Sequence, residues 1–158
     1  MSILSGFRTV SSGADKRRCG RITDTYRGSD MNNAASYWSP LCEMVMHLRC
    51  WARVGWKEGA STQATRWGQL LTIPTAGYLE ASGGPIPVRD VEWVEVSTSH
   101  IKGGLAGRPW QMISAKEELL TGLRETQLNW ELVESMWSVD GLFEDEPVQV
   151  VRVLNPLG

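Results

Sequence analysis

The chain has 158 residues, of which 42% are hydrophobic and 22% are charged. This is the composition and length of one folded globular domain, and it excludes a disordered chain. The net charge of −2 conceals an asymmetry, because residues 1–66 carry ten Lys and Arg against five Asp and Glu, whereas residues 67–158 carry six against thirteen. No stretch approaches the roughly 18 apolar residues of a membrane span. The first ten residues lack the apolar run of a secretion signal, and three cysteines are an odd number, so we expect free thiols and a cytoplasmic location.

Residues 1–33 are predicted to form an extended basic N-terminal arm, and residues 34–158 a single domain. Positions 11–33 contain few large apolar side chains, so this stretch has little to bury on its own. Arginine binds both carboxylates and phosphates through its forked donors. We therefore predict that the arm contacts a partner through its cations and its tyrosine: Lys16, Arg17, Arg18, Arg21, Tyr26 and Arg27.

The first predicted helix begins at Ser39-Pro40, a typical N-cap and first helical position, and ends at Gly55. Apolar residues recur along it with helical spacing: Leu41, Met44, Val45, Leu48, Trp51 and Ala52. Arg49 and Arg53 lie towards its end, where they are expected to extend the basic surface of the arm.

Two strands are predicted next, over residues 65–73 and 88–97, the first from its alternating apolar residues and the second from its Val and Trp content. The turn-forming stretch 81–85 lies between them and suggests that they pair in an antiparallel way. Residues 101–109 read as a Gly-rich loop.

A second long helix is predicted from Ser114, with Glu117 completing a capping box, to Asp140-Gly141. Its apolar face comprises Leu119, Leu120, Leu123, Trp130, Val133 and Trp137. Thr126 and Gln127 interrupt that face and indicate a kink. Residues 147–154 are predicted to form a closing strand. The expected fold is therefore α+β, with a small, mainly antiparallel sheet of about three to four strands packed by two long helices.

Chemical signals are weak in this sequence. Glu43, His47 and Cys50 have a spacing that would place them on one helix face as candidate metal ligands or as a Cys–His pair, but a half-exposed helix face explains them better. No metal site, cofactor or catalytic residue is assigned. One candidate anion-binding loop combines free backbone amides with flanking cations, although it lacks the P-loop pattern. Its residues are Lys102, Gly103, Gly104, Gly107 and Arg108.

These features favour a non-enzymatic interaction or assembly protein that docks through the basic arm onto an acidic protein surface, either a neighbouring subunit or another protein. We expect an oligomer or part of a larger particle. One alternative is a nucleic-acid-binding adaptor, in which the same arginines bind phosphates while Trp or Tyr side chains stack on bases. The other is a small enzyme with a site near His100 and the loop 103–107.

Overall fold

A computed structural model describes residues 28–156 of the chain except 74, 76, 105–108 and 140–142, and it describes no side chains for residues 28–35, 139 and 143–146. The regular elements, in chain order, are α1 (Gly28–Leu48), β1 (Ala52–Glu58), β2 (Ser61–Ala64), β3 (Leu71–Thr72), β4 (Tyr78–Ala81), β5 (Gly84–Pro87), the 3-10 turn η1 (Val88–Asp90), β6 (Val91–Ser97), β7 (Ser99–Lys102), β8 (Gln111–Ser114), α2 (Lys116–Arg124), β9 (Trp130–Val139) and β10 (Phe143–Leu154).

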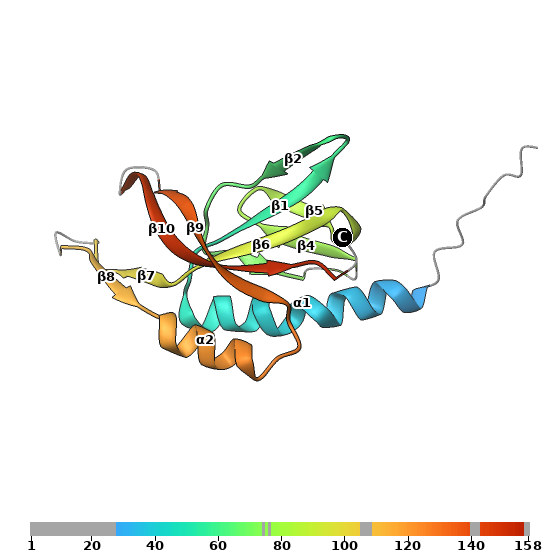
Figure 1. Ribbon diagram of the computed structural model, residues 1–158, viewed down its shortest axis with the longest axis horizontal. Helices are drawn as coiled ribbons and strands as arrows, with labels where there is room; N and C mark the ends of the chain where they lie inside the picture. The colour runs from blue at the N-terminus through green and yellow to red at the C-terminus, as the bar shows by residue number, and fades with distance from the viewer. Residues whose placement is uncertain (1–27, 74, 76, 105–108, 140–142, 157–158) are drawn as a thin grey trace, which may run out of the picture.

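A curled antiparallel sheet of five strands, in the order β2-β1-β6-β10-β9, organises the molecule, with α1 and α2 together below one of its faces (Figure 1). Two smaller sheets flank it, one of β3, β4 and β5 and the other the hairpin β7–β8. The prediction of a small sheet packed by two long helices is therefore wrong. Most of the regular structure is sheet, and only α1 is long.

Helix α1 begins twelve residues before the predicted start and passes through Pro40. A proline inside a helix removes one hydrogen bond and costs about 3 kcal/mol. Here Trp38, which precedes it, is fully buried, and this packing outweighs the local signal to start a helix at Ser39-Pro40. The predicted apolar stripe is confirmed from Leu41 to Leu48, since its residues are buried or packed against the core. The predicted end at Gly55 is wrong, because α1 ends at Leu48 and Gly55 lies in β1.

The second predicted helix is correct only in its first third. Helix α2 ends at Arg124, and the apolar residues from Trp130 onward belong to strand β9. Val133 and Trp137 share a face in either structure, since a spacing of four residues is close to one helical turn and is also an even number of strand positions. The interruption at Thr126 and Gln127 marks the end of the helix and not a kink.

The strand pairing between residues 65–73 and 88–97 was also predicted wrongly. Only Leu71–Thr72 forms a strand within the first range, and it pairs with β4. The turn at 81–84 is present but joins β4 to β5, while β6 lies between β1 and β10. The closing strand is present in β10 and starts earlier than predicted, at Phe143. Pro147 is tolerated because β6 ends opposite Val150, so no neighbouring strand needs the N–H that Pro147 lacks on that side.

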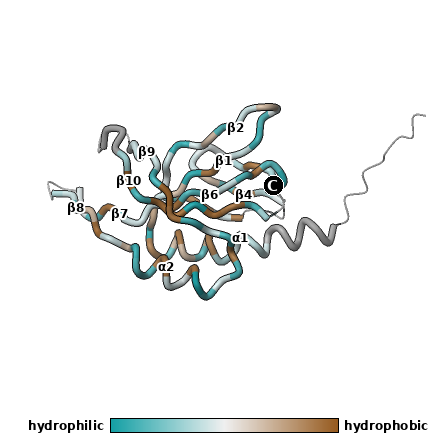
Figure 2. The backbone as a smooth tube through the Cα atoms, in the orientation of Figure 1, coloured by the Kyte–Doolittle hydropathy of each residue, from teal (hydrophilic) through white to brown (hydrophobic). Residues whose placement is uncertain are grey.

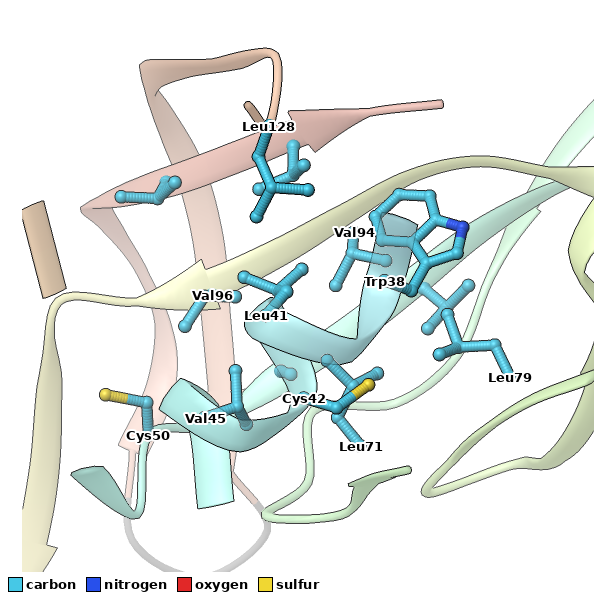
Figure 3. Packing of buried hydrophobic residues seen from close by; sticks show 14 of the residues in the cluster. Trp38, Leu41, Cys42, Val45, Cys50, Leu71, Leu79, Val94, Val96 and Leu128 are labelled. Carbon is cyan, nitrogen blue, oxygen red and sulfur yellow. The ribbon is translucent and has the colours of Figure 1, made fainter. Parts of the chain in front are cut away.

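The main core lies between the sheet and α1 (Figure 3), where Trp38, Leu41 and Val45 of the helix meet Val94 and Val96 of β6. Figure 2 shows hydrophobic residues concentrated where β6 and β10 cross above the helices. A second, smaller cluster forms on the other face of the sheet around Trp67, Trp137 and Val150. Both faces of the sheet centre are therefore covered, and side chains of β1, β6 and β10 that point away from the helices are also removed from water.

Candidate functional site

Three charged residues lie directly opposite one another across the three central strands, on the face away from α1. Glu95 in the middle of β6 is in register with Arg53 of β1 and with Arg152 of β10. The alternation of strand residues produces this placement, since Val94 and Val96 on either side of Glu95 enter the main core. Each arginine also has core residues as its neighbours in sequence.

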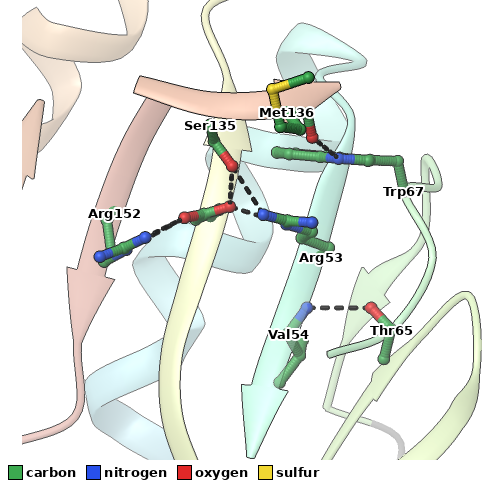
Figure 4. Close-up of polar contacts among 8 residues, drawn as sticks. Arg53, Val54, Thr65, Trp67, Ser135, Met136 and Arg152 are labelled. Atoms are coloured by element: carbon green, nitrogen blue, oxygen red, sulfur yellow. Dashed lines mark hydrogen bonds and ion pairs between the residues drawn. The ribbon is translucent and has the colours of Figure 1, made fainter. Parts of the chain in front are cut away.

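The two arginines and Ser135 hydrogen-bond both carboxylate oxygens of Glu95 (Figure 4). Arg53 Nε and Ser135 Oγ donate to Oε2 at 2.7 and 2.8 Å, and Arg152 Nε and Nη2 donate to Oε1 at 3.0 and 2.6 Å. Arg53 Nη2 also donates to Ser135 Oγ at 2.6 Å. Ser135 belongs to β9, so this cluster, the Glu95 cluster (Arg53, Glu95, Ser135 and Arg152), ties four strands of the sheet together.

The Glu95 carboxylate is fully buried, whereas the arginine side chains are 23% and 31% exposed. Burial by itself would raise the pKa of Glu95, but the hydrogen bonds from Arg152, Arg53 and Ser135 outweigh it and hold that pKa below its ordinary value. A carboxylate in this state is ionised and has no free lone pair aimed at solvent. It is suited to fixing the strands and not to proton transfer.

Tryptophans cover the Glu95 cluster. The guanidinium carbons of Arg53 and Arg152 lie 5.6 and 5.2 Å from the Trp93 ring centroid, and that of Arg53 lies 4.9 Å from the Trp67 centroid. These distances are typical of cation–π contacts. Gly55 lies opposite Trp93 in the β1–β6 pair, and a Cβ at this position would overlap the Trp93 indole. A glycine is therefore required for Trp93 to cover the two arginines.

Trp67 also connects the two sides of the curled sheet. Its Nε1 donates to the Met136 carbonyl of β9 at 3.1 Å, and its ring meets Trp137 edge-on at 6.5 Å. The adjoining Gly68 exchanges backbone hydrogen bonds with Ala52 of β1. The segment after β2 thus joins the β1 side of the sheet to its far strand, β9.

Two cavities lined by described residues bear on the search for a site. One, of about 620 Å³, lies between α1 and α2 and is lined by Tyr37, Met44, Thr126 and Leu128 with the carboxylates of Glu43 and Glu125. The other, of about 210 Å³, lies where the two projecting hairpins meet the sheet, next to Met112, Trp137 and Val148. Neither cavity brings together a nucleophile, a base and an oxyanion-binding group.

The candidate anion-binding loop is the connection of the β7–β8 hairpin. Lys102 ends β7 and is exposed, and Gly103 and Gly104 have φ of 94° and 82°, a conformation that favours glycine. Gly107 and Arg108 lie outside the described residues. His100 is in β7 opposite Ile113, and its Nδ1 is buried without a hydrogen-bond partner among the described residues. No nucleophile is hydrogen-bonded to it there.

The arm residues Lys16, Arg17, Arg18, Arg21, Tyr26 and Arg27 lie outside the described residues, and α1 begins at Gly28, within the range assigned to the arm. Arg49 is exposed just after α1. Arg53, predicted to extend the basic surface, is bound to Glu95 inside its own chain. Arg49 and Arg53 are therefore not equivalent, because only Arg49 leaves its charge towards solvent.

The metal-ligand spacing on α1 does not produce a shared face. Glu43 and His47 are exposed, whereas Cys50 follows the end of the helix and is fully buried. Cys42 and Cys50 are free thiols, as predicted. Burial raises the pKa of Cys42 to about 12 and that of Cys50 to about 11, so neither thiol resembles a reactive cysteine.

Sequence reasoning missed Glu95, Ser135 and Arg152. A signal was present, since Glu95 and Arg152 each stand between two valines in the middle of an apolar strand, and opposite charges in such positions indicate a buried pair. Ser135 had no comparable signal, because its role depends on how β9 curls.

Four of the seven large apolar side chains that are exposed among the described residues lie on the β7–β8 hairpin or on β9. Trp110 and Met112 on β7–β8 are each 43% exposed, and Leu132 and Met136 on β9 are 38% and 49% exposed. Figure 1 shows both hairpins extending from the same side of the molecule. Exposed apolar side chains that gather on projecting elements are typical of interaction surfaces.

No protein-family model, curated protein or solved structure matches this chain. None of the described helices is long and apolar enough to cross a membrane.

Proposed function

We propose that this is a non-enzymatic assembly or interaction protein of the cytoplasm that docks its basic N-terminal arm onto an acidic protein surface. The proposed contacts are Lys16, Arg17, Arg18, Arg21, Tyr26 and Arg27, with Arg49 as the exposed cation closest to them in sequence. Arg53 is left out because Glu95 occupies it.

The observation that carries this proposal is a contrast between two sets of side chains. The polar groups of the Glu95 cluster bond to one another, whereas large apolar side chains are exposed at the edge of the molecule. The hydrogen bonds of the Glu95 cluster are made within the cluster itself. The two cavities described above hold no catalytic arrangement. Large apolar side chains are instead presented on the hairpins. The free, buried thiols of Cys42 and Cys50 support a reducing compartment.

The test uses the full chain, purified with its bound partners from the cells that produce it and weighed by native mass spectrometry. Changing Arg17, Arg18 and Arg21 to Gln should abolish the complex, because these side chains supply the proposed attraction to the partner. The control changes three exposed cations of the folded domain, Lys57, Arg89 and Arg124, to Gln. It alters the net charge equally and should leave the complex intact.

A complex that survives the arm substitutions, or that is lost equally in the control, would overturn the proposal. The partner's chemistry separates the alternatives. A complex that contains DNA or RNA and is released by nuclease would favour the nucleic-acid adaptor, in which the same arginines contact phosphates.

A further inference from the structure

Strand β9 offers the longest unpaired strand edge among the described residues. It runs for ten residues at the end of the five-stranded sheet, where only β10 pairs with it. The opposite edge strand, β2, has four residues. An exposed strand edge is a template for another strand, and natural proteins usually block it with charge, proline or a covering segment.

The direction of the β9 backbone groups follows from two hydrogen bonds. Leu154 N–H donates to the Asn129 carbonyl, so odd-numbered residues of this strand face β10. The Met136 carbonyl accepts the Trp67 indole N–H, so even-numbered residues face outward. Trp67 thus covers the edge at Met136. No hydrogen bond reaches the backbone of Leu132 or Glu134 from another described residue on that side.

The side chains along the same stretch suit a basic, partly apolar strand. Leu132, Glu134 and Met136 are exposed on one face, and Glu131 on the other face is exposed opposite Arg152. The open edge from Trp130 to Glu134 is therefore apolar and acidic. It has no exposed cation of its own, and lysine is the usual residue that blocks such an edge.

The arm contains a segment with complementary properties. Residues 21–27 read Arg-Ile-Thr-Asp-Thr-Tyr-Arg, and the β-branched and aromatic residues in this segment favour a strand. Alternation in a strand would place Arg21 and Arg27 on one face and Ile22 and Tyr26 on the other. Its seven residues are more than enough to span the open part of β9, which is five residues long.

We propose that residues 21–27 of one copy add to the β9 edge of a second copy between Trp130 and Glu134, with an arginine beside Glu134. This inference rests on the proposed function and narrows its partner to the chain itself. Backbone hydrogen bonds would supply the register and the charges would supply the selectivity. Because arm and edge are different surfaces, the contact is head-to-tail, and it would build rings or filaments.

The experiment compares three full-length proteins by size exclusion with light scattering over a concentration series. The unchanged protein should associate. An edge variant, Leu132→Lys with Glu134→Lys, and an arm variant, Arg21→Glu with Arg27→Glu, should each remain monomeric. A mixture of the two variants should associate again, because the unaltered arm of the edge variant meets the unaltered edge of the arm variant.

A second substitution tests the backbone alone. Glu134→Pro removes an outward N–H that β10 does not use, so the fold should persist, as circular dichroism would report, while association is lost. Association that survives Glu134→Pro or the edge variant, or variants whose mixture stays monomeric, would overturn the β9 contact. A monomeric unchanged protein would overturn it as well, while the proposed docking of the arm onto another protein would still be decided by the arm substitutions above.

Discussion

Glu95 is the residue on which the centre of the sheet depends, because its charge is fully buried and neutralised by two arginines. Removing one partner of a buried ion pair costs more than the pair itself contributes, since the remaining charge stays in a poorly solvated place. In this molecule the two arginines retain some contact with water, which moderates that penalty.

We expect Glu95→Gln to lower the free energy of unfolding at neutral pH by about 3 kcal/mol, because it leaves two cations facing each other across β6. The control Glu92→Gln, on the same strand, removes a partly exposed ion pair with Lys57 at 3.5 Å, keeps an oxygen that can accept from the Thr62 hydroxyl, and should cost less than about 1 kcal/mol. Urea denaturation of the three proteins measures both effects. Equal losses in the two variants would contradict this account of the Glu95 cluster.

The pH dependence follows from the lowered pKa of Glu95. A carboxyl group with a lower pKa in the folded state contributes stability above its ordinary pKa and loses it as the pH falls through the folded-state value. The gap in unfolding free energy between the unchanged protein and Glu95→Gln should therefore be widest at neutral pH and should shrink in acid. Urea titrations at neutral pH and below the ordinary carboxyl range test this, and a constant gap would show that Glu95 does not titrate as described.

The two buried thiols give a further prediction about single residues. Because burial raises the pKa values of Cys42 and Cys50 to about 12 and 11, almost no thiolate exists at mildly alkaline pH. A thiol-specific reagent should leave Cys42 and Cys50 unmodified in the native protein and should modify both after denaturation. Rapid native modification of Cys42 or Cys50, located by peptide mass mapping, would be inconsistent with their packing.

Among the elements, helix α1 is followed by a residue, Arg49, whose backbone conformation would suit glycine better. Arg49 adopts φ of 55°, and the Cys50 N–H donates to the Val45 carbonyl at 3.1 Å, which together form a Schellman-type helix end. Glycine is the usual residue at the left-handed position because a Cβ is strained there.

Arg49→Gly should therefore raise the free energy of unfolding by about 0.5–1 kcal/mol. Arg49→Ala is the control, since it removes the same charge but keeps the Cβ, and it should give no gain. Thermal or urea unfolding measures the stability of both variants. A gain in stability with alanine equal to that with glycine would assign the effect to the lost charge and not to backbone strain.

The elements show which sequence signals are reliable. The apolar stripe of α1 and the strand within β10 were predictable because their buried residues follow one period. Strand β9 was mistaken for a helix because Val133 and Trp137, which share one face of the strand with Ser135, are also spaced as on a helix. Its strand alternation is also weak, because Ser135 is buried beside Glu95 while Leu132 and Met136 on the other face are exposed. The partner that buries Ser135 is far away in the sequence and leaves no local signal.

For the molecule as a whole, the uneven charge of the sequence predicts how association and folding respond differently to salt. Contacts between an exposed basic arm and an acidic surface are screened as the Debye length falls from about 10 Å at 0.1 M salt to about 3 Å at 1 M, whereas the buried Glu95 cluster is screened much less. We expect the dissociation constant of the arm-dependent complex to rise by at least roughly tenfold over this range. The unfolding free energy should change little.

Light scattering and urea unfolding at the two salt concentrations measure these two quantities on the same protein. Association that is insensitive to salt would contradict a contact made by arginines. The asymmetry of charge itself could be read from the sequence. The acidic, apolar edge of β9 could not, because it requires knowing that this segment is a strand and that it ends the sheet.

The partners of Glu95 have one further consequence, for the order in which the chain can fold. Arg53, Ser135 and Arg152 lie 42, 40 and 57 positions from Glu95 in sequence. During synthesis, β6 would therefore leave the ribosome with Arg53 already made, but the Glu95 cluster would stay incomplete until Ser135 and Arg152 follow. Such distant contacts slow folding, so this domain should reach its native state only after Arg152 has been synthesised, and chains truncated before Arg152 should fail to fold.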